Sequence, residues 1–202
     1  MSMNTGRCAD KGAEKRVYWI TGASSGIGME VARALAKARN YVFVSARSEE
    51  KLACLHEAYP ENIGIIPLDV TDPHSIAAAE QLLNEKTDHL DTLVACAGTC
   101  EYDDHLALPV DLYERVTRTN YLGTVETVRV ALPLLRKSQL SPHIAAVSSL
   151  SAVVPFPRAA AYGASKAALD YFLQSLQIDL KPENISVTSI RPGFVDTPLT
   201  QR

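Results

Sequence analysis

The chain has 202 residues, 47% of them hydrophobic, and a formal net charge of −3 at pH 7. This length is enough for one well-buried core and short for two independent domains. Acidic and basic residues are interspersed, which argues against a broad field for nucleic acid or for an anionic membrane surface, so we expect a small-molecule partner instead.

Residues 1–16 are polar and lack hydrophobic periodicity, so we expect a flexible N-terminal arm followed by a single domain over residues 17–202. No apolar run approaches the ~20 residues that span a bilayer. No charged-then-apolar leader is found and the cysteines show no framework spacing, which indicates reduced thiols in a cytoplasmic protein. These cysteines are Cys8, Cys54, Cys96 and Cys100.

Strand-like apolar runs alternate with helical patterns along the chain, at residues 17–23, 41–47, 63–70, 92–98, 143–149 and 185–193. Continuous apolar runs are typical of parallel strands that are covered on both faces. Helix punctuation agrees, because Thr71 or Asp72 caps a helix that has Pro73 in its first turn, and Lys181-Pro182 closes another that begins near Ala160. The alternation predicts an α/β fold with a doubly wound parallel sheet.

The first strand leads into a glycine-rich turn, T-G-A-S-S-G-I-G at residues 21–28, just before a helical pattern. Such a turn presents helix N-terminal amides to an anion: Gly22 lets the chain turn, Gly26 lets a pyrophosphate approach the backbone, and Gly28 lets the helix pack tightly. Glycines also close ordinary strand-to-helix joints, so the turn alone predicts only a phosphate-binding cradle. Its G-x-x-x-G-x-G spacing resembles the cofactor turn of the short-chain dehydrogenase/reductase family, which implies cofactor contacts at Gly22, Ser24, Ser25, Gly26, Ile27 and Gly28.

The second and third strand ends bear on the choice of nucleotide. An acidic side chain after the second strand would favour a free ribose, but this chain has Ala46 followed by Arg47. A guanidinium can bind phosphate oxygens in a fork, so NADP(H) is favoured over NAD(H), unless Arg47 is only a solvated helix-start residue. The resemblance implies an adenine contact at Asp69, with Val70 beside it.

The segment after the fourth strand run is Ala95-Cys96-Ala97-Gly98, where the family usually has Asn-Asn-Ala-Gly. The resemblance implies that Ala97 and Gly98 let the cofactor pass. Because the asparagines are lost, either water or another side chain replaces them or the sheet is looser there. Cys96 is expected to be a small buried hydrophobe, and no metal site is predicted, since a set of Cys96, Cys100 and His105 lacks a fourth ligand.

The catalytic candidates follow in chain order. Asn120 lies in a helix predicted over residues 109–136, although asparagine is a poor interior helix residue. Ser149 ends the fifth strand run, and Tyr162 and Lys166 follow, four residues apart and so on one helix face. A lone pair of this kind arises by chance, but the order and spacing of all four resemble the catalytic set of the family.

The resemblance implies hydride transfer between a nicotinamide and a carbonyl or carbinol carbon. Tyr162 is then the general acid/base, and Lys166 stabilises its anion and holds the ribose hydroxyls. Ser149 donates to the substrate oxygen, and Asn120 anchors a water that relays the proton. The alternative is a catalytically silent, nucleotide-sensing or regulatory binding protein that keeps the cofactor turn without turnover.

The segment R-P-G-F-V-D-T after the sixth strand run matches the family's P-G-x-V-x-T motif. The resemblance places Pro192, Gly193, Val195 and Thr197 beside the nicotinamide. The substrate wall would depend on Ser151, Phe156, Phe194 and a segment beyond them, so the sequence does not identify the substrate.

The resemblance to this family, in its branch of ordinary length, covers residues 17–198 and implies a Rossmann fold with strand order 3-2-1-4-5-6. It also implies a homodimer or homotetramer that pairs through the helices after Pro109 and Ala160. Relatives continue past this point with a lid, a last helix and a seventh strand, for which these 202 residues have no counterpart. We favour a piece of a longer protein over a shortened member with an open site.

Overall fold

The computed structural model describes residues 15–199, which form a six-stranded sheet in the order β3-β2-β1-β4-β5-β6. Every neighbouring pair of strands is parallel. The predicted doubly wound fold and strand order are therefore confirmed, although each strand ends earlier than its apolar run. The strands are β1 Val17–Thr21, β2 Tyr41–Ser45, β3 Ile63–Ile65, β4 Thr92–Ala95, β5 His143–Val147 and β6 Ser186–Ile190.

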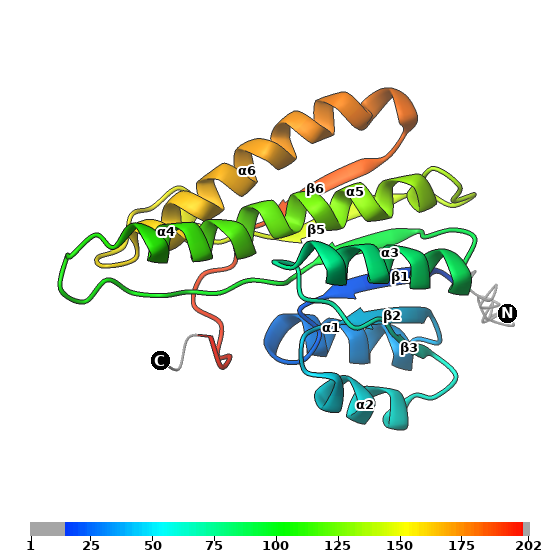
Figure 1. Cartoon of the computed structure of the whole chain (residues 1–202). Coiled ribbons are helices and arrows are strands. Elements are labelled where there is room, and N and C mark those ends of the chain that lie inside the picture. The colour runs from blue at the N-terminus through cyan, green and yellow to red at the C-terminus, as the bar shows by residue number, and fades with distance from the viewer. Residues whose placement is uncertain (1–14, 200–202) are drawn as a thin grey trace, which may run out of the picture.

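Helices cover both faces of the sheet because neighbouring residues of a strand point to opposite sides. In β1, Trp19 joins the cluster formed with α3, α5 and α6, whereas Ile20 joins the cluster formed with α1 and α2. Figure 1 shows these layers around the sheet. The helices are α1 Gly26–Lys37, α2 Glu49–Ala58, α3 Pro73–Lys86, α4 Val110–Thr117, α5 Gly123–Leu135 and α6 Ala160–Leu180.

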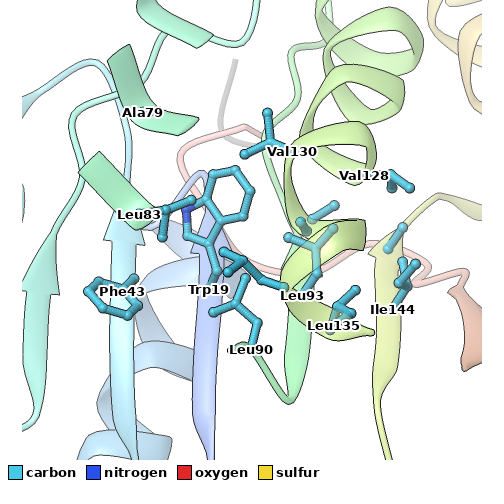
Figure 2. Packing of buried hydrophobic residues seen from close by; sticks show 14 of the residues in the cluster. Trp19, Phe43, Ala79, Leu83, Leu90, Leu93, Val128, Val130, Leu135 and Ile144 are labelled. Atoms are coloured by element: carbon cyan, nitrogen blue, oxygen red, sulfur yellow. The ribbon is translucent and has the colours of Figure 1, made fainter. Parts of the chain in front are cut away.

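Trp19 anchors the larger cluster. Its side chain is 1% exposed. It extends from β1, and Leu83 of α3 and Val130 of α5 lie close to its ring (Figure 2). Its indole Nε1 donates to the Ser45 hydroxyl on β2 at 2.8 Å, so the polar end of the ring is not left unpaired. One side chain thus joins two strands to two covering helices.

The helix predicted over residues 109–136 is helical but not uniform. A π-helical turn, Arg118–Leu122, separates α4 from α5 and contains Asn120. Such turns interrupt an α-helix and are frequent at functional sites. The poor helix propensity of Asn120 is thus accommodated by a local change of winding that turns its side chain into the fold.

The start of α3 and the end of α6 lie close to where the sequence predicts them. The Asp72 side chain, rather than that of Thr71, caps α3 by accepting from the His74 amide at 3.0 Å. Helix α6 ends at Leu180, before a 3₁₀ turn, Lys181–Glu183, that contains Pro182. Another 3₁₀ turn, Leu150–Ala152, follows β5.

The expected N-terminal arm falls mostly outside the described residues, which begin at Lys15. Arg16, its last residue, is hydrogen-bonded: its amide donates to the Asn40 side chain at 3.2 Å, and its carbonyl accepts from the Tyr41 amide. No helix between residues 15 and 199 is long and apolar enough to cross a membrane.

Candidate active site

The glycine turn joins β1 to α1 at the carboxyl edge of the sheet. Gly22 and Gly26 have φ angles of +68° and +54°, which side-chain-bearing residues rarely adopt. A Cβ on Gly22 would lie 2.7 Å from the Ala97 nitrogen, and one on Gly28 would lie 2.5 Å from the Gly22 oxygen. The turn is therefore pressed against the end of β4, and α1 is pressed against the turn.

The first turn of α1 is open to an anion. Its N-cap residue, Ser25, makes no side-chain capping bond, and residues 26–29 include no acidic group. The amides at this end carry the positive end of the helix dipole. A Cβ on Gly26 would lie 3.2 Å from the Thr197 side chain, so the predicted cofactor segment after β6 folds over the glycine turn.

The ends of β2 and β3 place Arg47 and Asp69 near each other. Arg47 is exposed, and Asp69 accepts at one carboxylate oxygen from both the amide and the hydroxyl of Thr71, at 2.9 and 2.7 Å. Burial works to raise the pKa of Asp69, but the Thr71 hydrogen bonds and the Arg47 charge hold it below its usual value. Val70 is buried, and both its side chain and its carbonyl oxygen pack against Gly123.

Lys166 is the buried cation of the site, at 4% exposure, and its Nζ donates to the Val147 carbonyl at 2.7 Å. Burial lowers its pKa to about 8, against the opposing influence of Cys96, Asp170 and Cys100. Gly98 lies next to it: an added Cβ would be 3.6 Å from Nζ and, more closely, 3.2 Å from the Asn120 Oδ1. The segment after β4 and the end of β5 therefore meet at this ammonium group.

Tyr162 lies one helical turn before Lys166, whose Nζ is 5.9 Å from the tyrosine ring centroid. Burial raises the pKa of Tyr162, a hydrogen bond with Ser149 lowers it, and Cys100 raises it further. Ser149 also accepts from the Ser151 amide at 3.1 Å, which orients its hydroxyl. A phenol, a hydroxyl and a buried ammonium are thus brought together at the carboxyl end of β5.

Asn120 is fully buried and braces two segments. Its Oδ1 accepts from the Thr99 amide at 2.7 Å, and its Nδ2 donates to the Thr99 carbonyl and the Ser165 hydroxyl, both at 2.9 Å. Both amide hydrogens are therefore used. A relay water would have to bond to the remaining lone pair of Oδ1 or to the backbone carbonyl.

The segment that lacks the family's asparagines is tied in other ways. The Thr21 hydroxyl accepts from the Ala97 amide at 3.3 Å, which links the end of β1 to this segment. Burial raises the pKa of the Cys96 thiol to about 12, so the thiol is protonated at neutral pH and resembles a small hydrophobe more than a nucleophile. Within residues 15–199 no group of three His, Cys, Asp or Glu side chains could hold a metal ion.

The segment after β6 passes close to the catalytic candidates. The Pro192 carbonyl accepts from the Leu150 amide at 3.0 Å, next to Ser149. Gly193 is open, with nothing within 4 Å of an added Cβ. The rings of Phe156 and Phe194 meet edge to face, with centroids 5.7 Å apart. The two aromatic residues expected in the substrate wall are therefore in contact.

Sequence reasoning missed several polar residues that support this arrangement. Ser165 accepts from Asn120 and donates to the Tyr162 carbonyl at 2.7 Å. Asp170, 4% exposed, accepts from the Ser189 hydroxyl at 2.6 Å and from Arg191. The four-residue spacing that picks out Tyr162 and Lys166 continues to Asp170, which is a signal that the sequence does contain.

Comparisons with known proteins bear on the family and the fold. A family model described as short chain dehydrogenase matches residues 16–202. An uncharacterized oxidoreductase of Staphylococcus haemolyticus is 36% identical over 188 residues, which are 93% of this chain and 81% of the relative.

Solved structures share this fold. An alcohol dehydrogenase of the archaeon Thermococcus sibiricus, complexed with 5-hydroxy-NADP, superposes with a TM-score of 0.85 at 26% identity, covering 93% of this chain and 80% of that one. A 3-ketoacyl-(acyl-carrier-protein) reductase of Brucella melitensis, complexed with NADH, gives a TM-score of 0.87 at 25% identity, covering 93% and 79%.

Proposed function

The chain belongs to the short-chain dehydrogenase/reductase family, and from this premise we propose that it transfers hydride between NADP(H) and a carbonyl or secondary alcohol, with Tyr162 as general acid/base. One observation carries the proposal. The buried Lys166 ammonium lies beside a tyrosine that is hydrogen-bonded to Ser149, at the sheet edge where the glycine turn opens. Phenol, hydroxyl and ammonium are the groups that proton transfer to a carbonyl oxygen requires.

The residues present fit a dinucleotide. Positive φ angles disfavour side chains at Gly22 and Gly26, and the backbone of Cys96 and Ala97 also closes the space beside Gly22, so the turn before α1 presents backbone rather than side chains. The helix end favours a pyrophosphate there, and Lys166 can hold ribose hydroxyls next to Gly98. The nicotinamide supplies the hydride when it is bound. Structural neighbours bind NADP-type and NAD-type cofactors, so a nicotinamide cofactor is supported by both.

NADP(H) is the form that we propose for this chain. The exposed guanidinium of Arg47 follows β2, where Ala46 replaces the acid that would bind a free ribose. The Arg47 charge also helps to lower the pKa of the Asp69 carboxyl, so the guanidinium acts on the ends of both β2 and β3. A 2′-phosphate at this place would receive a charge-assisted, forked hydrogen bond.

In the direction of reduction, Tyr162 donates its proton to the carbonyl oxygen while Ser149 donates a hydrogen bond to the same atom. Burial raises the pKa of Tyr162, so formation of its anion needs a nearby positive charge. Lys166 supplies that charge, because a pKa of about 8 leaves most of its amine protonated at neutral pH. The Asn120 side chain joins Thr99, in the segment after β4, to Ser165, the residue before Lys166.

The proposal is tested by NADPH consumption with a panel of aldehydes, ketones and diketones. Tyr162→Phe should lower turnover ~10²- to 10⁴-fold, because it removes the acid, while the NADPH dissociation constant stays within about twofold. Tyr41→Phe is the matched control, since Tyr41 is partly exposed at the amino end of β2, opposite the site. Turnover by Tyr162→Phe at the wild-type rate would refute the role of Tyr162. Binding of NADPH without turnover of any compound would support the regulatory binding protein instead.

We also propose that copies of the chain pair through α4, α5 and α6, as a homodimer or homotetramer in the cytoplasm. Tyr171 and Ile178 are largely exposed on α6, which supports an apolar contact on that helix. Light scattering at several concentrations measures the assembly. A mass of one chain at every concentration would contradict it.

A further inference from the structure

Asp170 is a buried carboxylate for which the proposed chemistry has no direct use. Tyr162, Lys166 and Asp170 recur at intervals of four on α6 and so share one helix face. The first two lie at the reaction centre, and the third lies one turn farther along the helix. At 4% exposure, a charge at this position is costly unless it is well partnered.

The partners of Asp170 come from the two strand ends that enclose the site. It accepts from Ser189 on β6 at 2.6 Å and from Arg191 just beyond β6. Hydrogen bonding by Ser148, the residue after β5, also lowers the pKa of Asp170, and the Ser148 hydroxyl lies 3.5 Å from the Lys166 carbonyl as well. Ser148 immediately precedes the catalytic candidate Ser149, and Arg191 immediately precedes Pro192 of the cofactor segment. One carboxylate therefore connects α6 to both segments.

Backbone hydrogen bonds join the segment that contains Ser149 to the end of β6 and the residues after it. The Ser148 amide donates to the Ile190 carbonyl at 2.8 Å, and the Leu150 amide donates to the Pro192 carbonyl at 3.0 Å. The residues that flank Ser149 are thus held by the segment that Asp170 fastens. A shift of the end of β6 would move both the hydroxyl of Ser149 and the wall of the cofactor site.

Asp170 also acts on Lys166 through its charge. The titratable groups near enough to Lys166 to act on it are Cys96 and Cys100 from the segment after β4, and Tyr162 and Asp170, one turn before and one turn after it on α6. The thiols are neutral at pH 7, because burial raises the pKa of both, and Tyr162 is neutral as the proton donor. Asp170 is then the anion that opposes the loss of a proton from buried Lys166.

We propose that Asp170 is a positioning residue of the active site: it keeps Lys166 charged and fastens the strand ends that carry Ser149 and Pro192. Its effect on turnover rests on the proposed function, but its effect on Lys166 does not. Its salt-bridge partner Arg191 is partly exposed, at 41% of its side chain, so water screens the guanidinium more than the carboxylate. The Asp170–Arg191 pair therefore produces a net negative electrostatic potential at Lys166.

The test is the titration of Lys166 in the chain without cofactor, followed by NMR of ¹³Cε-labelled lysine and assigned with Lys166→Met. Asp170→Asn should lower the Lys166 midpoint by about one pH unit. Asp179→Asn is the matched control, because Asp179 is exposed on the same helix, and it should leave the midpoint unchanged. An unchanged midpoint in Asp170→Asn would overturn the proposal.

Arg191→Gln separates charge from structure, since it breaks the ion pair but keeps the Asp170 carboxylate. We expect it to lower the melting temperature without lowering the Lys166 midpoint. If Arg191→Gln and Asp170→Asn lower the midpoint equally, the pair is merely structural and the proposal is wrong. Should Asp170→Asn fail to fold, Asp170→Glu keeps the negative charge at a displaced position. A Lys166 midpoint near that of the wild type would then support the charge effect. A Lys166 midpoint about one pH unit lower, as expected for loss of the charge, would refute it.

Turnover gives the second readout, with NADPH and 9,10-phenanthrenequinone as the probe. In Asp170→Asn the alkaline limb of the kcat profile should move to lower pH by the same amount as the Lys166 midpoint, and Asp170→Glu should restore it. A fall in kcat that is equal at every pH would contradict the charge effect. If the wild type reduces no compound, the proposed function fails, while the Lys166 titration still decides the role of Asp170.

Discussion

Replacement of Gly22 by alanine tests whether the glycine turn is held by close backbone contact. At φ +68° an alanine pays ~1–2 kcal/mol for the left-handed conformation. Its Cβ would also lie 2.7 Å from the Ala97 nitrogen and 2.8 Å from the carbonyl of Cys96. These are backbone atoms at the end of β4, and the Ala97 amide is already bonded to Thr21, so they cannot turn aside as a flexible side chain would. Overpacking of this kind costs ~1–3 kcal/mol.

We therefore expect Gly22→Ala to lose about 2–5 kcal/mol of unfolding free energy, as the sum of the two costs. Guanidinium chloride unfolding measures it, with the fluorescence of Trp19, the only tryptophan, as the probe of the core. Gly193→Ala is the control, because nothing lies within 4 Å of its added Cβ. A Gly22→Ala variant as stable as the wild type, or equal losses in the two variants, would refute the reasoning.

Three further changes have defined outcomes. Asp91→Ala should lose about 3 kcal/mol in urea unfolding, because this fully buried carboxylate accepts from the Val17 amide and the Ser138 hydroxyl. Arg47→Gln should weaken NADPH binding ~10-fold by fluorescence titration and leave NADH binding unchanged, because only NADPH has the 2′-phosphate. Lys166 has a pKa of about 8 in the folded protein, against an ordinary value of 10.5. Between these two pH values the unfolded chain binds a proton that the folded chain has lost, so the free energy of unfolding should rise with pH. Relative to Lys166→Met, the wild type should gain about 3 kcal/mol of unfolding free energy across this interval, as measured by urea unfolding.

Each of these has a matched control. Asp88→Ala removes an exposed acid from the same loop, and a loss as large as that of Asp91→Ala would show that the buried bonds do not matter. Arg33→Gln removes an exposed guanidinium from α1, and equal weakening of NADPH binding would show a general charge effect. For Lys166, parallel pH curves in the wild type and Lys166→Met would show that its pKa is not lowered in the fold.

Much of the fold could be predicted from local patterns. The apolar runs located all six strands, because parallel strands buried on both faces need continuous apolar sequence. Each run overshot its strand at the carboxyl end, because residues just beyond a strand, such as Cys96 after β4, are packed inside the fold for reasons other than strand pairing. A run of apolar residues does not by itself distinguish burial within a strand from burial of the segment that follows the strand.

The candidate site was predicted in part, through short-range spacing. Tyr162 and Lys166 share a face because helices repeat at that interval, and the glycine turn is recognisable because its backbone excludes side chains. These are local constraints, which a chain records within a few residues. The assignment of roles came from a family resemblance, and those roles remain predictions until the variants are measured.

Contacts between distant segments were decided only by the tertiary structure. The sequence by itself determined the six strands, the glycine turn and the helix face of Tyr162 and Lys166, since each depends on neighbours along the chain. The π turn that directs Asn120 to Thr99 and Ser165, and the pairing of Asp170 with Arg191, depend on which strand ends meet at the sheet edge. A buried polar group must find a partner wherever packing brings one, and that choice is made by the whole fold.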